Sequence, residues 1–486
     1  MLHGNEGHLL PAGASPGKTV PEEIMATQHV IIGGGPAATN AMETIRELDQ
    51  QALITLISDE PAHSRMALPY WLSAQIPAAH THTADAAFFQ QLNVDARIGQ
   101  RVTAVDPNGQ TVTLTDGDKL AFDKLLIATG SSPLDLPVPG NELAGVQNLW
   151  SLDHTQQLLD STKNVEQPRV LMIGAGFIGF IMLNAMHKRG WNLSVVERES
   201  HVLPRMLNAD AAGMVTSWLT SRGIDLHCGA AVESIAEGAD GVKTVALDNG
   251  TTLSADVVIV AIGIKTNLAF LDGSGIETNQ GILVNEQMQT NLPNIFAAGD
   301  VAEGPVLGSN QKEVHPIQPT AVDHGRIAGT NMAGETVTYR GSLSMNILDC
   351  CGLQTASFGR WDDPSDDILT ISNPTDLVYR KLIWQEDQVV GALFAGRAND
   401  MGMLNDLGMV KGMLQTQARM GAWKQFLQEN PFDIRRAYIA AGVPQQLVST
   451  TLLGRPSQPR QYRFGGAVSA VQANQSHTVF VDAKSN

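Results

Sequence analysis

Two glycine-rich stretches have the spacing that binds the phosphates of a dinucleotide. The first, QHVIIGGGPAA, spans residues 28–38 and places Gly33, Gly35 and Ala38 in the pattern G-x-G-x-x-G/A after a short apolar run. The first position makes a tight turn after a strand, the second lets a pyrophosphate approach the backbone, and the third lets the following helix pack closely on the strand. The N-terminus of that helix then meets the phosphates. A first nucleotide site is predicted here, with Pro36 among its contacts.

A second copy of the pattern, RVLMIGAGFIG, spans residues 169–179 and contains Gly174, Gly176 and Gly179 at full spacing. The next expected strand ends in Glu197, where an acidic side chain binds a ribose 2′-hydroxyl. The same carboxylate would repel a 2′-phosphate, so if the nucleotide carries nicotinamide, NADH is preferred over NADPH, although the neighbouring arginine weakens this preference. Two such patterns in one chain predict two dinucleotide sites.

Acidic residues also follow the second apolar run of the first unit. Residues 40–50 are expected to form a helix and residues 52–58 a buried parallel strand, which ends at Asp59 and Glu60. One of these carboxylates should bind the adenosine ribose of the first nucleotide. Glu60 is the first candidate and Asp59 the alternative.

Strand and helix patterns along the rest of the chain indicate an α/β protein in several domains. Residues 100–130 alternate as strands, 209–221 have helical spacing, and 225–262 read as strands of an inserted second nucleotide-binding unit. After Tyr339 strands return, and helices follow from about residue 400. The expected divisions are a flexible extension at 1–27, a first nucleotide-binding domain at 28–145 and 283–335, a second at 146–282, a C-terminal α+β domain at 336–430, and a helical extension with a mobile tail at 431–486.

Composition excludes several classes of function. The formal net charge of −17 leaves no basic excess for nucleic acid or an anionic membrane. The longest apolar runs are far shorter than the roughly 20 residues that cross a membrane, and the N-terminus lacks the pattern of a secretory signal. Three cysteines in 486 residues do not form a disulfide framework and indicate a reducing cytoplasm. No metal site is expected.

Further short motifs complete a family resemblance. Ala128, Thr129 and Gly130 form an ATG motif, Gly263 ends an AIG motif, and the segment NIFAAGD ends in Gly299 and Asp300. In this order, and with the two glycine patterns, the chain resembles the pyridine nucleotide-disulfide oxidoreductase superfamily of flavoproteins over about residues 28–335. The C-terminal strands resemble the interface domain of the branch that contains ferredoxin, rubredoxin and nitrite-reductase-type flavin reductases and single-cysteine NADH oxidases.

The resemblance implies cofactors and roles. The first glycine pattern would bind FAD, the second NAD(P)H, and Asp300 would bind the ribityl chain of FAD. A helix that begins near Thr320 would direct its positive N-terminal end at the flavin pyrimidine ring and favour the negative charge of the reduced ring. The C-terminal domain of this family usually mediates dimer contacts, so a homodimer is expected.

The segment PAHSRMALPYWLS at residues 61–73 departs from the redox-cysteine branch of the family. It contains no cysteine, and Met66 occupies the position of the redox thiol. Tyr70 and Ile181 stand where the ferredoxin-reductase branch often has a lysine and a glutamate. Arg65 is expected to contact the flavin or a phosphate.

These observations predict an FAD-dependent NADH oxidoreductase that passes electrons to a small redox protein or a small molecule without a protein disulfide. Two alternatives stay open, an NADH oxidase that reduces oxygen and a flavin-containing binding subunit of a larger redox complex. The adjacent Cys350 and Cys351 could form a redox pair, but buried strand positions are the favoured reading because strand neighbours point to opposite faces. The acceptor is not identified.

Overall fold

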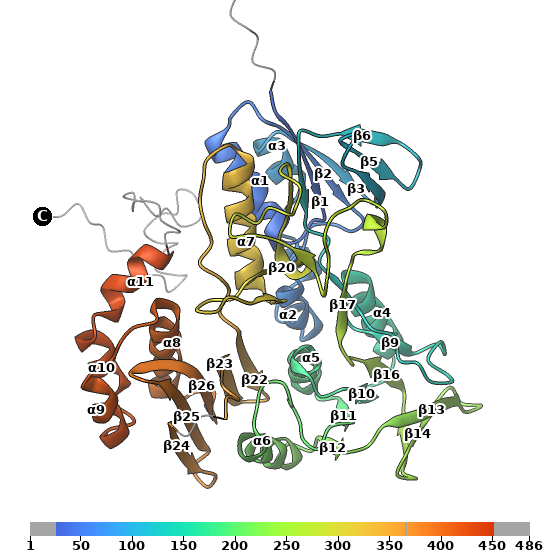
Figure 1. Ribbon diagram of the computed structural model, residues 1–486. Coiled ribbons are helices and arrows are strands. Elements are labelled where there is room, and N and C mark those ends of the chain that lie inside the picture. Colours follow the sequence, from blue (N-terminus) through green and yellow to red (C-terminus); the bar gives the residue numbers. More distant parts are fainter. Residues whose placement is uncertain (1–25, 365–366, 452–486) are drawn as a thin grey trace, which may run out of the picture.

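The first glycine pattern lies between strand β1 (Gln28–Ile32) and helix α1 (Pro36–Leu48) of a five-stranded parallel sheet. The protein is represented by a computed structural model that describes residues 26–364 and 367–451 (Figure 1). Most of the expected N-terminal extension and all of the tail beyond residue 451 lie outside the described residues.

The first sheet has the strand order β19-β7-β1-β2-β3, and every neighbouring pair is parallel. Strands β1, β2, β7 and β19 are short, mostly apolar and mostly buried because both faces are covered, whereas the edge strand β3 is partly exposed. Helices α1 and α7 lie side by side on one face (Figure 1), and side chains of a small antiparallel sheet, β4-β5-β6, join the same core. The strands not yet given are β2 (Leu53–Ser58), β3 (Val94–Ile98), β4 (Val102–Asp106), β5 (Thr111–Leu114), β6 (Lys119–Ala121), β7 (Lys124–Ile127) and β19 (Ile295–Ala297).

Close contact between α1 and α7 (Gln318–Met332) depends on a glycine. A Cβ atom on Gly325 would lie 2.2 Å from the carbonyl oxygen of Ala37, so only glycine lets the two backbones approach this far. Because Ala37 lies in the first turn of α1, this contact places the middle of α7 against the N-terminus of α1.

The second sheet is inserted between β8 (Ser131–Pro133) and β17 (Ile264–Thr266), two short strands that pair with each other in antiparallel fashion. Its order is β12-β11-β10-β16-β9, again all parallel. The remaining elements of this unit are β9 (Val146–Asn148), α4 (Leu152–Thr162), β10 (Arg169–Ile173), α5 (Phe177–Lys188), β11 (Asn192–Glu197), α6 (Ala209–Ser221), β12 (Asp225–Cys228), β13 (Val232–Glu237), β14 (Lys243–Leu247), β15 (Thr252–Ala255) and β16 (Val257–Val260).

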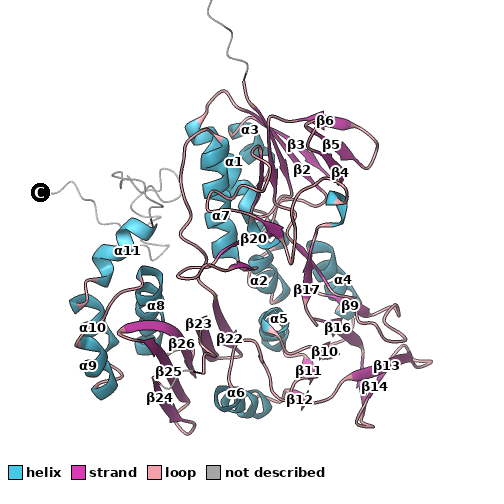
Figure 2. Ribbon diagram, in the orientation of Figure 1, coloured by secondary structure: helices cyan, strands magenta, loops and turns pink. Residues whose placement is uncertain are grey.

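The C-terminal part is an antiparallel sheet with helices at one side (Figure 2). Its order is β22-β23-β26-β25-β24, from β22 (Met345–Cys350), β23 (Leu353–Gly359), β24 (Ile368–Asn373), β25 (Val378–Gln385) and β26 (Gln388–Arg397). Helices α8 (Met401–Thr416), α9 (Trp423–Glu429), α10 (Ile434–Ala440) and α11 (Val443–Thr451) follow. Side chains of α8, α9 and α10, with Val443, form one core with β23, β25 and β26. Helix α10 and the start of α11, which belong to the helical extension predicted from residue 431, therefore pack against the C-terminal domain.

The predicted fold class is confirmed: two parallel nucleotide-binding-type sheets precede an antiparallel sheet with helices. The helix expected at 209–221 has these bounds in the structure. Helix α1 begins at Pro36 rather than Asn40, because the glycine turn leads directly into a proline at the first helical position. Strand β24, whose polar side chains are largely exposed, was not predicted. None of the described helices combines the length and apolarity that a membrane crossing requires.

Candidate cofactor and active site

A large cavity of about 1210 Å³ lies where the three parts of the chain meet. Its lining includes the first glycine turn, the end of β2, the first turns of α5 and the residues just before and within the start of α7. Met345, Asn346 and Ile347 of β22 complete it from the C-terminal sheet. Of the sequence-predicted site residues, the cavity is lined by Gly33, Gly35, Pro36, Asp59, Glu60, Arg65, Ala128, Thr129, Gly130, Gly299 and Asp300.

The first glycine turn has the shape of a phosphate cradle. Gly33 has φ +102°, and a Cβ atom there would lie 2.2 Å from the carbonyl oxygen of Ala128. Gly35 differs, because a Cβ atom there would meet no protein atom within 4 Å. Space is therefore left open at the position where a pyrophosphate would approach. Ala38, in the first turn of α1, is fully buried and does not line the cavity. These features fit a dinucleotide such as FAD.

The second glycine turn repeats this geometry. Gly174 has φ +100°, a Cβ atom there would lie 2.4 Å from the Ala261 carbonyl oxygen, and Gly176 again faces open space. At Gly179 a Cβ atom would lie 2.8 Å from Sδ of Met172, so the helix rests directly on β10. This turn fits a second dinucleotide. The large cavity reaches α5 beyond the turn through Phe177, Ile178, Ile181 and Met182.

The Glu197 carboxylate lies against the second turn. Its Oε2 accepts a 2.7 Å hydrogen bond from the backbone N–H of Ala175, and its Oε1 accepts a 2.9 Å bond from that of Glu199. The acidic side chain is thus held at the phosphate loop by the protein itself. A ribose bound over this loop would meet a carboxylate whose orientation is already set.

The two carboxylates after β2 have different partners. Asp59 pairs with Arg101 at 2.5 Å, and both side chains are exposed. Glu60 Oε1 lies 3.9 Å from Arg65 Nη2, a longer and looser contact. Both residues line the cavity, and Glu60 is the less engaged of the two.

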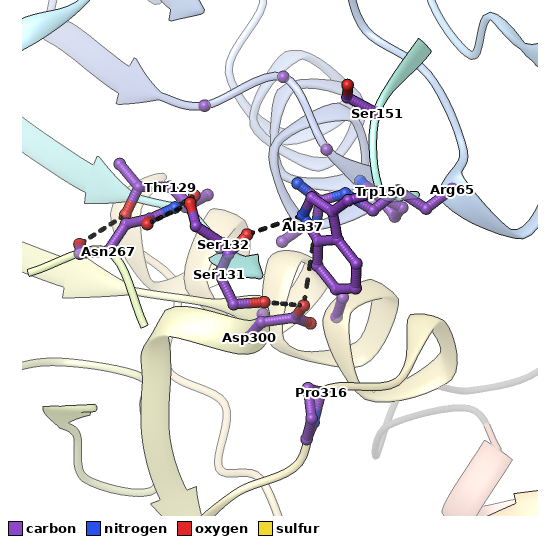
Figure 3. A pocket seen from close by; sticks show the side chains of 18 of the residues that line it. Ala37, Arg65, Thr129, Ser131, Ser132, Trp150, Ser151, Asn267, Asp300 and Pro316 are labelled. Atoms are coloured by element: carbon purple, nitrogen blue, oxygen red, sulfur yellow. Dashed lines mark hydrogen bonds and ion pairs between the residues drawn. The ribbon is translucent and has the colours of Figure 1, made fainter. Parts of the chain in front are cut away.

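A polar cluster around Asp300 occupies the middle of the cavity (Figure 3). Ser131 donates a 3.0 Å hydrogen bond to Oδ2 of Asp300, and Arg65 Nη1 lies 3.9 Å from the same oxygen. Burial raises the pKa of the Asp300 carboxyl, and the nearby Arg65 charge and the Ser131 bond oppose this rise. Both contacts are made by Oδ2, and the carboxylate can accept further hydrogen bonds from a polyhydroxyl chain.

The N-terminus of α7 opens onto the cavity through Pro316, Ile317, Gln318 and Pro319. Thr320, which was expected to contact the flavin, is buried one residue farther into the helix and does not line the cavity. His324 on the same helix is fully buried, and burial lowers its pKa to about 3. His315 is also buried. Both histidines thus occupy packed positions.

The chain passes from the first nucleotide-binding unit to the second near β8 and returns near β17, and Asn267 links these two segments by hydrogen bonds. Its Nδ2 donates to the Thr129 carbonyl oxygen at 2.8 Å, and its Oδ1 accepts from Ser132 Oγ at 2.8 Å (Figure 3). Gly130 and Gly263 have positive φ values, 65° and 139°, where the chain turns into and out of this junction. Gly263 itself lies outside the cavity lining.

Met66, at the predicted redox-cysteine position, lines the cavity. Ile181 also lines it. Tyr70 is exposed and does not line it. All three cysteines of the chain fall within the described residues; they are free, and none lines this cavity. Cys350 and Cys351 are buried, and burial raises the pKa of Cys351 to about 12, which leaves little reactive thiolate.

Ser131, Trp150 and Asn267 are among the cavity residues that were not predicted. Ser131 follows the ATG motif directly, so its place beside Gly130 was a usable signal. Trp150 and Asn267 stand in no motif, and their neighbours in space are distant in sequence.

Comparison with known proteins agrees with this geometry. Residues 27–325 match the pyridine nucleotide-disulphide oxidoreductase family. The chain is 30% identical over 376 residues to the epsilon subunit of the NADH-dependent phenylglyoxylate dehydrogenase of Aromatoleum evansii, covering 76% of this chain and 88% of that subunit. It is also 30% identical over 347 residues to a rubredoxin-NAD(+) reductase of Alcanivorax borkumensis, covering 68% and 87%.

The fold is shared with putidaredoxin reductase in its covalent complex with putidaredoxin, at a TM-score of 0.77 and 22% identity over 86% of this chain and 99% of that one. The chain belongs to the pyridine nucleotide-disulphide oxidoreductase family. It is therefore an oxidoreductase of a family that binds FAD and uses NAD(P)H, as the motifs predicted.

Proposed function

We propose that this protein is an FAD-dependent NADH reductase that passes electrons to a separate acceptor without a protein disulfide. The observation that carries the proposal is one continuous cavity between the first glycine turn and α5, lined by Met66 and, within the described residues, by no cysteine. When bound, FAD supplies the redox chemistry, because it accepts hydride from NADH and passes electrons onward. The chain's own residues bind, orient and shield the two reactants.

The proposed assignments follow the two turns. Residues 28–145 and 283–335 would hold FAD, with Gly33, Gly35 and Pro36 at the pyrophosphate, Glu60 at the ribose, and Asp300 at the ribityl chain. Residues 146–282 would hold NADH, with Gly174 and Gly176 at the phosphates. Glu197 would favour NADH, since a carboxylate already bonded to the loop would repel a 2′-phosphate.

Positioning of the two rings is the main catalytic contribution that these residues support. Hydride transfer requires ring atoms roughly 3–3.5 Å apart in the right orientation. Phe177, Ile178 and Ile181 present an apolar wall on the cavity side that faces the second unit, which would exclude water from a nicotinamide ring. The N-terminus of α7 would stabilise negative charge on a reduced ring.

A small redox protein is the first candidate acceptor. A relative named rubredoxin-NAD(+) reductase matches most of its own length to this chain, and this supports the assignment. An NADH oxidase that reduces oxygen is the runner-up. The three free cysteines support a reducing compartment such as the cytoplasm, and a homodimer through the C-terminal sheet stays part of the proposal.

A second candidate function is that of an NADH-oxidising subunit in a larger redox complex. The observation that favours it is the relative from Aromatoleum evansii, which carries the name of an epsilon subunit and matches this chain over 88% of its own length. In that case the isolated chain would accept electrons from NADH and would turn over slowly until its partner subunits were added.

Anaerobic titration tests the proposal. The purified protein is reduced stepwise with dithionite and, separately, with NADH, and then mixed with oxygen, rubredoxin or ferredoxin. We expect two electrons per FAD and rapid reoxidation by one of the redox proteins. The matched Cys350→Ala, Cys351→Ala double variant should give the same electron count. Four electrons in the wild type and two in the variant would make the vicinal thiols a redox centre and overturn the proposal.

A further inference from the structure

Arg65 is a half-buried cation with unused hydrogen-bond donors inside the cavity. Its two carboxylate neighbours, Glu60 and Asp300, both lie 3.9 Å away, which is beyond the length of a charge-assisted hydrogen bond. Its Nε is buried and has no hydrogen-bond partner within the part of the chain that the structure describes. A guanidinium group has five donors in a fixed fork, so this arrangement leaves it ready to meet an oxygen acceptor.

Trp150 holds this guanidinium group from one side. The Cζ atom of Arg65 lies 4.5 Å from the centre of the Trp150 ring, within the range of a cation–π contact. The indole Nε1 donates a 3.0 Å hydrogen bond to the carbonyl oxygen of Ser131, which fixes the ring in turn. Figure 3 shows the Trp150 ring beside Arg65, in the same cluster as Ser131 and Asp300, while a dashed line joins Arg65 directly to Asp300.

Trp150 and the residues that it contacts belong to different parts of the chain. Trp150 follows β9, the edge strand of the second sheet, whereas Arg65, Ser131 and Asp300 surround the cavity of the first unit. A residue attached to the NADH unit therefore contributes to the site proposed for FAD. Ser131 links the two sides, because its carbonyl oxygen accepts from Trp150 while its hydroxyl group donates to Asp300.

We propose that Trp150 is a positioning residue that holds Arg65 for an anionic oxygen of bound FAD. This inference rests on the proposed function only in taking FAD as the occupant of the first site. Without the aromatic ring, the long Arg65 side chain would sample other rotamers, and ordering it on binding would cost affinity. The ring thus pre-organises the guanidinium group before the cofactor arrives.

A double-mutant cycle on FAD affinity separates positioning from packing. Trp150→Met keeps most of the side-chain volume but removes the aromatic face, and Trp150→Phe keeps a face but loses the indole hydrogen bond. The dissociation constant of FAD is measured on the reconstituted full chain by flavin fluorescence. We expect Trp150→Met to weaken FAD binding about tenfold and Trp150→Phe by less than about threefold.

The Arg65→Gln background gives the decisive comparison. In that background Trp150→Met should change FAD affinity by less than about threefold, because the group that the ring positions is already gone. The melting temperature of the FAD-free protein should stay close to that of the wild type in every Trp150 variant. An equal loss of affinity with and without Arg65, or a wild-type affinity in Trp150→Met, would overturn the inference.

Trp218→Met is the matched control. Trp218 also stacks under an arginine, with Arg222 Cζ at 4.2 Å from its ring, and also donates through Nε1 to a backbone carbonyl oxygen, that of Cys351 at 3.1 Å. It lies outside the cavity, so its loss should leave FAD affinity unchanged. A wild-type protein that binds no FAD at all would refute the proposed function instead, which keeps the two failures distinguishable.

Discussion

The two dinucleotide-binding units share their turns and differ in their surroundings. Gly33 and Gly174 have nearly equal φ values, +102° and +100°, and in each unit a Cβ atom would collide with the carbonyl oxygen of a neighbouring strand end. Over the first turn lie Arg65, Asp300 and the start of α7, which come from three distant parts of the chain. At the second turn, Glu197 of the adjacent strand bonds the loop itself.

This difference indicates how one local pattern can serve two kinds of ligand. A site enclosed by several elements suits a cofactor that stays bound, because each element removes part of it from water. A turn that relies on its own strand and helix leaves the ligand freer to exchange. Tertiary neighbours, rather than the glycine pattern, therefore distinguish the two turns.

The largest expected effect comes from alanine at the first turn glycine. Gly33→Ala combines a positive φ with a contact of 2.2 Å to backbone, so we expect a loss of about 3 kcal/mol in unfolding free energy and of FAD binding. The matched Gly174→Ala should lose NADH reduction while keeping bound FAD. Denaturant unfolding and flavin absorbance measure both. Loss of FAD in both variants to the same degree would show that the two units do not act independently.

A smaller effect, on the choice between NADH and NADPH, is expected from substitution of Glu197 in the second unit. Glu197→Gln keeps the side-chain shape but removes the charge that would repel a 2′-phosphate, so the ratio of kcat/KM for NADH over NADPH should fall about tenfold. Glu199→Gln is the control, because the side chain of this neighbour is exposed and forms an ion pair with Arg198 at the surface. An unchanged ratio in Glu197→Gln would remove Glu197 from nucleotide selection.

The smallest effect concerns the buried carboxyl of the first unit in the FAD-free protein. Its pKa is raised by burial, so ionised Asp300 destabilises the fold above that pKa, and this cost disappears as pH falls toward 3.8. Asp300→Asn should therefore raise the melting temperature at pH 7 by about one to two degrees, and the gain should vanish near pH 4.

Asp256→Asn provides the opposite sign for comparison. A hydrogen bond from Arg169 lowers the pKa of Asp256, so its ionised form stabilises the fold above 3.8, and this stability is lost as pH falls through the lowered pKa. Its substitution should lower the melting temperature at pH 7. If Asp300→Asn also lowered the melting temperature, burial would not be the dominant influence on Asp300.

Local patterns were sufficient for much of the fold and part of the site. The glycine spacing predicted both turns because each depends on backbone angles and on contacts between adjacent strand, turn and helix. Asp300 was reached through the motif that ends at it, and α6 through its helical spacing. The sequence named both Glu60 and Asp59 as candidates for the ribose. Only the structure distinguishes them, because Asp59 forms an ion pair with Arg101.

What sequence alone determined about this protein is its class: two dinucleotide turns, the motifs of a flavoprotein family, and a cavity segment without cysteine. Tertiary structure alone decided that Trp150 meets Arg65, that Asn267 links the two segments that join the units, and that α8 and α10 share one core. The reason is physical. A turn is specified by residues next to one another, whereas contacts between distant side chains depend on how whole sheets and helices pack, and no spacing along the chain records that packing.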